Sequence, residues 1–222
     1  MDQEILVLAE KIVSLGAESV FIYGSRARDD NLPDSDWELG AILGDDKYLS
    51  RSELAKLAPD KVVIYPYLFL EIKAGVAQTP FTNSIWLTEI IKTGKTIAGE
   101  HLLESLRLPT ITKEDINDDS VFHKARALDA MLAQRNGAEE LAKDIFVKSC
   151  LLGMRDLILA SGGDFPLSYL EIVEKSKPLL PEKYKGLPLE ALQVRKGEVE
   201  LTAELAYKNI GFFTDVLELG VK

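Results

Sequence analysis

Residues able to bind phosphate are concentrated just after position 23. A strand-like apolar run ends at Gly24, and Ser25, Arg26 and Arg28 follow closely. A glycine without a side chain lets backbone N–H groups approach a ligand, and a serine hydroxyl adds a donor at an expected helix N-terminus. The two arginines bring positive charge to the same turn. The pattern predicts a phosphate site with these four residues as its ligands.

Two carboxylates follow in an acid-x-acid pattern. Ten residues separate Ser25 from Asp36, and Glu38 lies two positions further, at the start of a second strand-like run over 37–43. The period of two in a strand sends both side chains to one face. Convergent carboxylates repel each other without a cation, whereas a hard divalent ion such as Mg²⁺ is bound by such oxygens. With the phosphate site, the pair predicts metal-assisted chemistry on a nucleoside triphosphate.

This arrangement resembles the signature of the DNA polymerase β-type nucleotidyltransferase superfamily, on Gly-Ser-Arg-Ala-Arg at 24–28 and Ser-Asp-x-acid-Leu at 35–39. It is most similar to the minimal nucleotidyltransferase branch. That branch includes aminoglycoside nucleotidyltransferases and the antitoxin partners of small helical toxins. The resemblance covers about residues 18–100, because the run 90–97 is similar to the helix and Gly-bearing turn that close the core of that family.

The resemblance implies a third carboxylate on a later strand, and Glu71 stands in such a context, as a metal ligand or as the general base. Asp36, Glu38 and Glu71 would then be catalytic and would hold one or two Mg²⁺ ions, with ATP or another nucleoside triphosphate as substrate. Two positions depart from the family pattern. Asp29 stands where glycine is common, and Glu38 stands where the second acid is normally Asp. The longer Glu38 side chain moves its carboxylate, and a displacement of ~1 Å can cost ~100-fold in rate.

Other polar residues carry weaker functional signals. Lys148 and Arg155 lie seven positions apart on one helical pattern and could contact a triphosphate, but ordinary solvated helix charges are the favoured interpretation. His101 and His123 have no metal-ligand spacing and are expected to be structural. Cys150 lies among apolar residues, so a buried thiol is expected rather than a nucleophile.

The elements that must position the site alternate between helix and strand in the first hundred residues. The spacing of apolar residues, together with Gly and Pro breaks, indicates where the helices and strands lie. The predicted helices cover 5–15, 50–57 and 83–93, and the predicted strands cover 20–23, 37–43 and 61–72. Pro66 indicates an edge position or a bulge in the last strand. Interleaved strands and helices predict the α/β (α+β) class.

The chain changes character near residue 106. Nothing after it reads clearly as a strand, and long helical patterns are separated by turn-forming residues. These helices are predicted at 117–135, 138–161, 167–179 and 190–219. We therefore expect two domains: a nucleotidyltransferase catalytic domain over 1–106 and an all-α helical bundle over 107–222 that binds the acceptor.

Composition excludes several classes of protein. No apolar run in the 222 residues approaches the ~18 needed for a membrane span, and the N-terminus lacks the basic start of a signal peptide. A single cysteine favours a cytoplasmic location. The net charge of −10 argues against binding a long nucleic acid. Seven of the acidic residues lie between Asp29 and Asp46, where no Lys or Arg occurs, so the acidity is concentrated at the expected metal site.

The sequence therefore predicts a Mg²⁺-dependent nucleotidyltransferase that transfers a nucleoside monophosphate, AMP from ATP, to a hydroxyl of a small molecule or protein. Two alternatives stay open: a non-catalytic nucleotide-binding or interaction protein on the same fold, with Glu38 marking decay of the metal site, and an antitoxin-type protein adenylyltransferase. The expected partners are the nucleoside triphosphate and a hydroxyl-bearing acceptor, with no membrane and no long nucleic acid. A homodimer also stays open.

Overall fold

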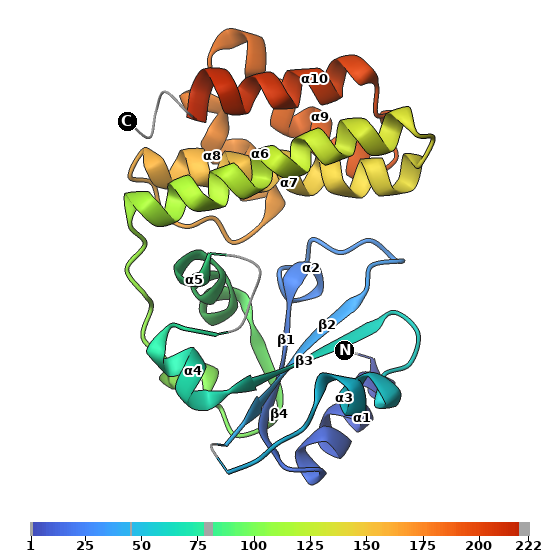
Figure 1. The fold of residues 1–222 in the computed structure, drawn as a ribbon, viewed down its shortest axis with the longest axis vertical. Helices are drawn as coiled ribbons and strands as arrows, with labels where there is room; N and C mark the ends of the chain where they lie inside the picture. The colour runs from blue at the N-terminus through green and yellow to red at the C-terminus, as the bar shows by residue number, and fades with distance from the viewer. Residues whose placement is uncertain (1, 45, 78–81, 218–222) are drawn as a thin grey trace. The chain divides into compact units, whose positions relative to one another are not determined.

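A four-stranded sheet forms the centre of the N-terminal half of the chain in the computed structural model, which describes residues 2–44, 46–77 and 82–217 (Figure 1). The strands are β1 (Ala17–Tyr23), β2 (Trp37–Leu43), β3 (Val62–Leu68) and β4 (Lys95–Gly99), in the order β3-β2-β1-β4. β1 is antiparallel to β2 and β4, and β2 is parallel to β3. The predicted strand over 37–43 is confirmed, and β4 is a strand that the sequence patterns did not reveal.

Helices pack on both faces of this sheet. They are α1 (Gln3–Ser14), α2 (Gly24–Ala27), α3 (Arg51–Leu57), α4 (Phe69–Ala74) and α5 (Asn83–Thr93), followed by the 3₁₀ turn η1 (Leu103–Ser105). Alternate strand residues divide into two cores. Ile22 and Leu39 share one core with Ile12 of α1, while Phe21 and Tyr67 share the other with residues of α5. The alternation follows from the period of two in a strand.

The predicted strand over 61–72 is wrong at its C-terminal end. β3 stops at Leu68, and α4 begins at the next residue and ends at Gly75, whose φ of 75° is the left-handed conformation typical of a helix end. Short apolar runs fit a strand and a buried helix equally well, so the sequence pattern alone does not separate them. Pro66 lies inside β3, which is an edge strand and therefore needs no backbone donor on its outer side.

Helices are the regular elements of the C-terminal half among its described residues. Its elements are α6 (Lys113–Arg135), α7 (Glu139–Ala160), α8 (Tyr169–Ser176), η2 (Lys177–Leu179), η3 (Glu182–Tyr184), α9 (Leu187–Arg195), α10 (Ala203–Phe212) and a π turn, η4 (Phe213–Leu217). The predicted single helix over 190–219 is wrong. Gly197 follows α9 with φ 72°, and Thr202 caps the start of α10 by accepting a hydrogen bond from Leu205 N–H. A left-handed glycine just after a helix ends it.

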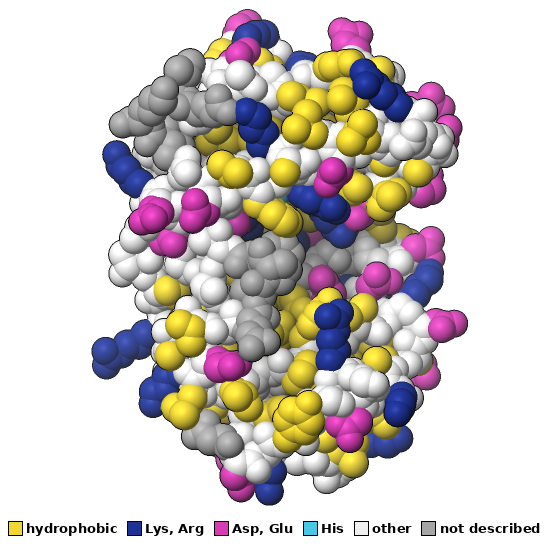
Figure 2. All heavy atoms as spheres, viewed as in Figure 1, with side chains coloured by type: hydrophobic (Ala, Val, Ile, Leu, Met, Phe, Trp, Pro, Cys, Tyr) yellow, Lys and Arg dark blue, Asp and Glu magenta, His cyan; other side chains and the backbone are white. Residues whose placement is uncertain are grey.

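The chain divides into two units, Met1–Thr110 and Ile111–Lys222, each with its own buried apolar core. The boundary expected from the sequence was 106/107. The predicted α/β (α+β) class is confirmed by the sheet and helices of the first unit and the helices of the second. None of the helices that the structure describes is both long and apolar enough to cross a membrane. Lys and Arg side chains are interspersed with Asp and Glu on the face in Figure 2.

Candidate functional site

Gly24 lies where β1 ends and α2 begins. Its φ is 71°, and a Cβ built on it would lie 1.8 Å from Glu38 Oε2. Glu38 stands directly opposite Tyr23 in the register of β1 and β2. The carboxylate of Glu38 is therefore packed against the backbone of Gly24, and any side chain at position 24 would displace it. The structure brings together the glycine turn and one of the two predicted metal ligands.

Ser25 is the second residue of α2 and is half-buried. Its hydroxyl makes no hydrogen bond within the described parts of the chain, and no side chain caps the start of the helix. The first N–H groups of any α-helix lack partners within the helix. The hydroxyl and these amides thus form a set of donors beside the Glu38 carboxylate.

Asp36 is exposed and directly precedes β2. The hydrogen bonds that pair β2 with β3 begin at the next residue, where Trp37 N–H donates to the carbonyl of Lys61 at 2.8 Å. Asp36 lies outside β2 and Glu38 within it, so their position on one side of the chain stays a prediction from the period of two in a strand. Asp34, by contrast, pairs with Lys61 at 2.9 Å, and this contact lowers the pKa of the Asp34 carboxyl.

Both predicted phosphate-binding arginines have partners within the protein. Arg26 Nε and Nη2 donate to the carbonyl of Ser35 at 3.0 and 2.5 Å. Arg28 Nε pairs with Asp30 Oδ2 at 3.0 Å, and Arg28 Nη1 pairs with Glu89 of α5. These contacts hold the turn after β1 to the loop before β2 and to α5. A phosphate would have to share the two guanidinium groups with them.

Glu71 does not lie where the sequence placed it. It is the third residue of α4 and not a strand residue. In the parallel register, Glu38 stands opposite Val63, and β3 runs five residues further to Leu68, which is ~16 Å at ~3.3 Å per residue. Figure 1 shows α4 at the end of β3 away from α2. Among the described residues, Asp36, Glu38 and Glu71 do not form a group of three metal ligands.

Tyrosines surround Glu38 on its face of the sheet. Burial raises the pKa of both Tyr23 and Tyr67, and the nearby charge of Glu38 raises each further. The two hydroxyls share a hydrogen bond, and the ring of Trp86 lies 5.1 Å from that of Tyr67. Because both phenols stay neutral, they are hydrogen-bond donors and leave the carboxylate as the charged group of this face.

Asp29, the residue in place of the family's glycine, keeps the conformation that glycine favours. Its φ is 60°, in the left-handed region. Asp is one of the few other residues that adopt this region at modest cost. The departure from the family pattern at this position therefore leaves the path of the backbone compatible with a glycine.

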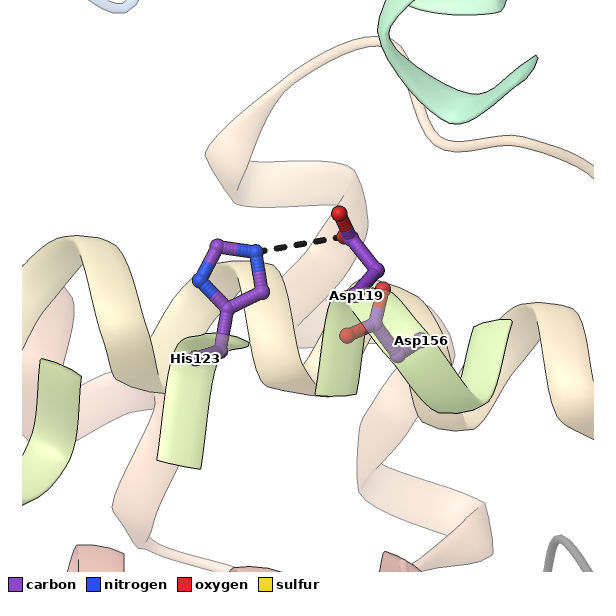
Figure 3. Close-up of side chains that lie close together, drawn as sticks. All are labelled: Asp119, His123 and Asp156. Atoms are coloured by element: carbon purple, nitrogen blue, oxygen red, sulfur yellow. Dashed lines mark ion pairs between the residues drawn. The ribbon is translucent and has the colours of Figure 1, made fainter. Parts of the chain in front are cut away.

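A second group of titratable side chains lies inside the helical unit and was missed by the sequence analysis (Figure 3). Asp119 and His123 of α6 and Asp156 of α7 offer ligand atoms that all lie within 4.8 Å of one another, and each residue is buried. His123 Nε2 lies 3.2 Å from Asp119 Oδ2, and Arg155 Nη2 donates to the same oxygen at 2.6 Å. The Asp-x-x-x-His spacing on α6 is the signal that could have revealed the pair, since residues four apart share a helix face.

The two carboxyls of this group have pKa values shifted in opposite directions. Burial raises the pKa of Asp156 well above its usual range, and the Asp119 charge raises it further. Burial would also raise the pKa of Asp119, but Arg155 and His123 lower it below its usual range. The two carboxyls are thus shifted in opposite directions, and Arg155 lies close to both, with Nη2 2.6 Å from Asp119 Oδ2 and Nε 3.7 Å from Asp156 Oδ1. The expectation of a solvated Arg155 is wrong, because its side chain is only 6% exposed.

Cys150, Lys148 and His101 lie outside both the turn at Gly24 and the buried group of Asp119, His123 and Asp156. Cys150 is fully buried, as expected, and burial raises the pKa of its thiol. Lys148 is exposed and pairs with Asp144 at 3.0 Å on the same helix. His101 is exposed and lies 3.0 Å from Glu104.

No protein-family model matches the chain, and no curated protein matches its sequence. Among solved structures, the chain is similar to the spectinomycin adenyltransferase AAD(9) from Enterococcus faecialis, whose crystal structure contains ATP and spectinomycin. The two chains are 15% identical, the match covers 97% of each, and the TM-score is 0.62. At this identity the likeness shows the fold. The chain thus shares its fold with this adenyltransferase over nearly its whole length, and the likeness does not single out the minimal branch that the sequence patterns resemble.

Proposed function

We propose that the protein is a Mg²⁺-dependent nucleotidyltransferase that transfers AMP from ATP to a hydroxyl of a small molecule or a protein. The observation that carries this proposal is the contact of the Glu38 carboxylate with the backbone of Gly24, the residue before Ser25. The fold shared with an adenyltransferase supports it. In this proposal the helical unit, residues 111–222, selects the acceptor.

The residues present fit a divalent ion and a triphosphate. Asp36 and Glu38 offer the carboxylate oxygens that Mg²⁺ prefers, from one side of β2. When bound, the ion would neutralise charge on the phosphates and on the leaving pyrophosphate. The hydroxyl of Ser25 and the first N–H groups of α2 would donate to phosphate oxygens. Glu71 lies on α4, beyond the end of β3, so this proposal does not use it as a ligand of the ion.

A second candidate function is a nucleotide-binding module without transfer activity. Two observations favour it. The second acid is Glu38, and the residue opposite it on β3 is Val63, so the neighbouring strand offers no carboxylate there. An antitoxin-type enzyme that modifies a protein partner stays within the first proposal, because its acceptor is also a protein hydroxyl.

Conversion of Asp36 to Asn tests the proposed function. The change keeps the shape of the side chain and removes its charge, so we expect pyrophosphate release from Mg²⁺–ATP to fall by at least ~100-fold. The matched control is Asp34→Asn, since Asp34 is an exposed acid of the same loop that pairs with Lys61. The readout is transfer of label from α-labelled ATP, with candidate small molecules and a cell extract as acceptors.

The possible outcomes separate the candidates. Full activity in the Asp36→Asn variant contradicts the assignment of the metal site. Metal-dependent ATP binding by calorimetry, with no pyrophosphate release from the wild-type protein, favours the nucleotide-binding module. Label that appears on a protein rather than on a small molecule identifies the antitoxin-type reaction.

A further inference from the structure

Arg26 contacts the chain on both sides of Asp36. Its guanidinium donates twice to the carbonyl of Ser35, at 3.0 and 2.5 Å, and once to the carbonyl of Pro33 at 3.4 Å. The same group lies 4.4 Å from the centre of the Trp37 ring. Ser35 and Trp37 are the two neighbours of Asp36, so one side chain fixes the backbone before and after this carboxylate.

The side chain of Asp36 does not hold itself in place. It is exposed, and within the described residues its own side chain makes no hydrogen bond or ion pair. The loop before it bends back on itself, because Ser35 N–H donates to the carbonyl of Leu32 and Leu32 N–H donates to Ser35 Oγ. The position of the Asp36 carboxylate is therefore set by the backbone on either side. Arg26 is the side chain that bonds to the carbonyls before it and stacks on the ring after it, and the bond from Trp37 N–H to the Lys61 carbonyl also holds this backbone.

We propose that Arg26 is a positioning residue, which holds the loop 33–37 so that Asp36 stays on the side of β2 where Glu38 lies, and that it is not a phosphate ligand. This inference rests on the proposed function. A planar guanidinium suits the task because it can donate in a fork to a carbonyl while its face stacks on an indole, which an ammonium group cannot do.

The alternative is that Arg26 binds phosphate directly, as its place in the glycine turn first suggested. The two roles predict different effects of an Arg26 substitution on the affinities for the metal ion and for ATP. A residue that positions Asp36 changes the affinity for the metal ion and leaves the metal-free affinity for ATP alone. A phosphate ligand changes the affinity for ATP even without metal, and leaves the affinity for the free ion alone.

The experiment compares Arg26→Ala, Arg26→Lys and Arg51→Ala in the full chain. Arg51 is the matched control, because it also stacks on an aromatic ring in the same unit, 4.4 Å from the centre of Tyr65, and donates to that hydroxyl at 3.1 Å. Two probes are used: Mn²⁺ alone, followed by electron paramagnetic resonance, and ATP in the presence of a chelator, followed by calorimetry.

We expect both Arg26 variants to weaken Mn²⁺ binding by ~10–100-fold, the usual effect of removing a group that orients a metal ligand. Metal-free ATP binding should change by less than ~2-fold, and Arg51→Ala should leave both affinities as in the wild type. The Arg26→Lys variant decides the matter if Arg26→Ala does not fold, since it keeps the charge and most of the side chain.

Wild-type Mn²⁺ affinity in Arg26→Lys overturns the proposal. So does a loss of metal-free ATP binding in Arg26→Ala with Mn²⁺ binding unchanged, which would make Arg26 a phosphate ligand. Failure of the proposed function has a different signature. In that case the wild-type protein has no Mn²⁺ binding that Asp36→Asn removes, whatever the residue at position 26.

Discussion

Two features of the structure require a glycine at position 24. The backbone turns from β1 into α2 with φ 71°, and the carboxylate of Glu38 occupies the space that a side chain would fill. The left-handed φ costs a residue with a side chain roughly 1–2 kcal/mol, and a Cβ at this position would force the Glu38 carboxylate to move. A glycine here is therefore required by the placement of Glu38 as well as by the turn.

Gly24→Ala separates these demands when it is compared with Gly75→Ala. Gly75 has φ 75° and nothing within 4 Å of its built Cβ, so its substitution adds only the backbone cost, about 1 kcal/mol. We expect Gly24→Ala to cost at least ~1 kcal/mol more than this, because a charged side chain must also be displaced. Urea denaturation measures the free energies of unfolding.

The same Gly24→Ala variant should also lose Mn²⁺ affinity, while Gly75→Ala keeps it. Equal destabilisation by the two variants would show that Glu38 moves aside at no cost. In that case its contact with Gly24 does not fix the position of the carboxylate.

At the scale of elements, a buried carboxyl pair joins α6 to α7. Ser120 Oγ donates to Asp156 Oδ2 at 3.3 Å, and burial together with the nearby Asp119 charge raises the pKa of the Asp156 carboxyl. Arg155 supplies the counterion from α7, and its guanidinium lies 5.7 Å from the centre of the Phe165 ring. The arrangement connects the two longest helices of the unit by a polar contact inside an apolar core.

This arrangement makes stability depend on pH. A carboxyl whose pKa is raised in the folded state holds a proton that the unfolded chain releases above its ordinary pKa of about 4. Folding then takes up a proton, so the contribution of Asp156 to stability is largest at low pH and is lost as pH rises. Asp119, whose pKa is lowered, contributes in the opposite sense, and its contribution is lost at acid pH.

Asp156→Asn should remove the first dependence. The amide mimics the protonated carboxyl and stays neutral, so the variant should gain stability relative to the wild type as pH rises from 4 to 8. The gain is at most ~1.4 kcal/mol per pH unit. Chemical denaturation at a series of pH values measures it.

The matched control is Asp144→Asn, an exposed acid on the same helix that pairs with Lys148. It should leave the pH dependence of stability unchanged. A difference between Asp156→Asn and the wild type that is the same at every pH would show that Asp156 is ionised in the folded protein.

At the scale of the whole molecule, no apolar core crosses residue 110 among the described residues, because two cores lie in the first unit and one in the helical unit. In the helical unit, Phe146, Phe212 and Phe213 are among the largest fully buried side chains. Gly153 of α7 leaves room for them, since a Cβ there would lie 2.5 Å from Phe213 Cζ. Each unit therefore buries its own apolar residues.

We expect residues 111–222, expressed alone, to fold into a helical protein that unfolds cooperatively, because its core needs no residue of the first unit. Circular dichroism and thermal unfolding provide the measurement. A fragment that stops at Arg195 is the control. It lacks Phe212 and Phe213 and should not unfold cooperatively. A fragment 111–222 that stays unfolded would show that the two units depend on each other for stability.

The sequence by itself determined the elements whose signals are local. The bounds of β2 and α5 follow from apolar runs and flanking breaks, and the Gly-Ser turn with the acid-x-acid pattern predicted the class of fold. The local signals were also sufficient to expect Gly24 and Glu38 in one site, although not that the carboxylate would lie against the glycine backbone.

Tertiary structure decided the features that depend on contacts between distant residues. The run after Leu68 is apolar enough for a strand or a helix, and it forms α4 beyond the end of the ladder with β2, so Glu71 lies on a helix and not on a strand. Arg26 bonds to a loop that only the folded chain brings near. Asp119 and Asp156 are 37 positions apart and meet because α6 packs on α7. Local patterns carry no information on such pairings, because the energy of each contact exists only once both partners are in place.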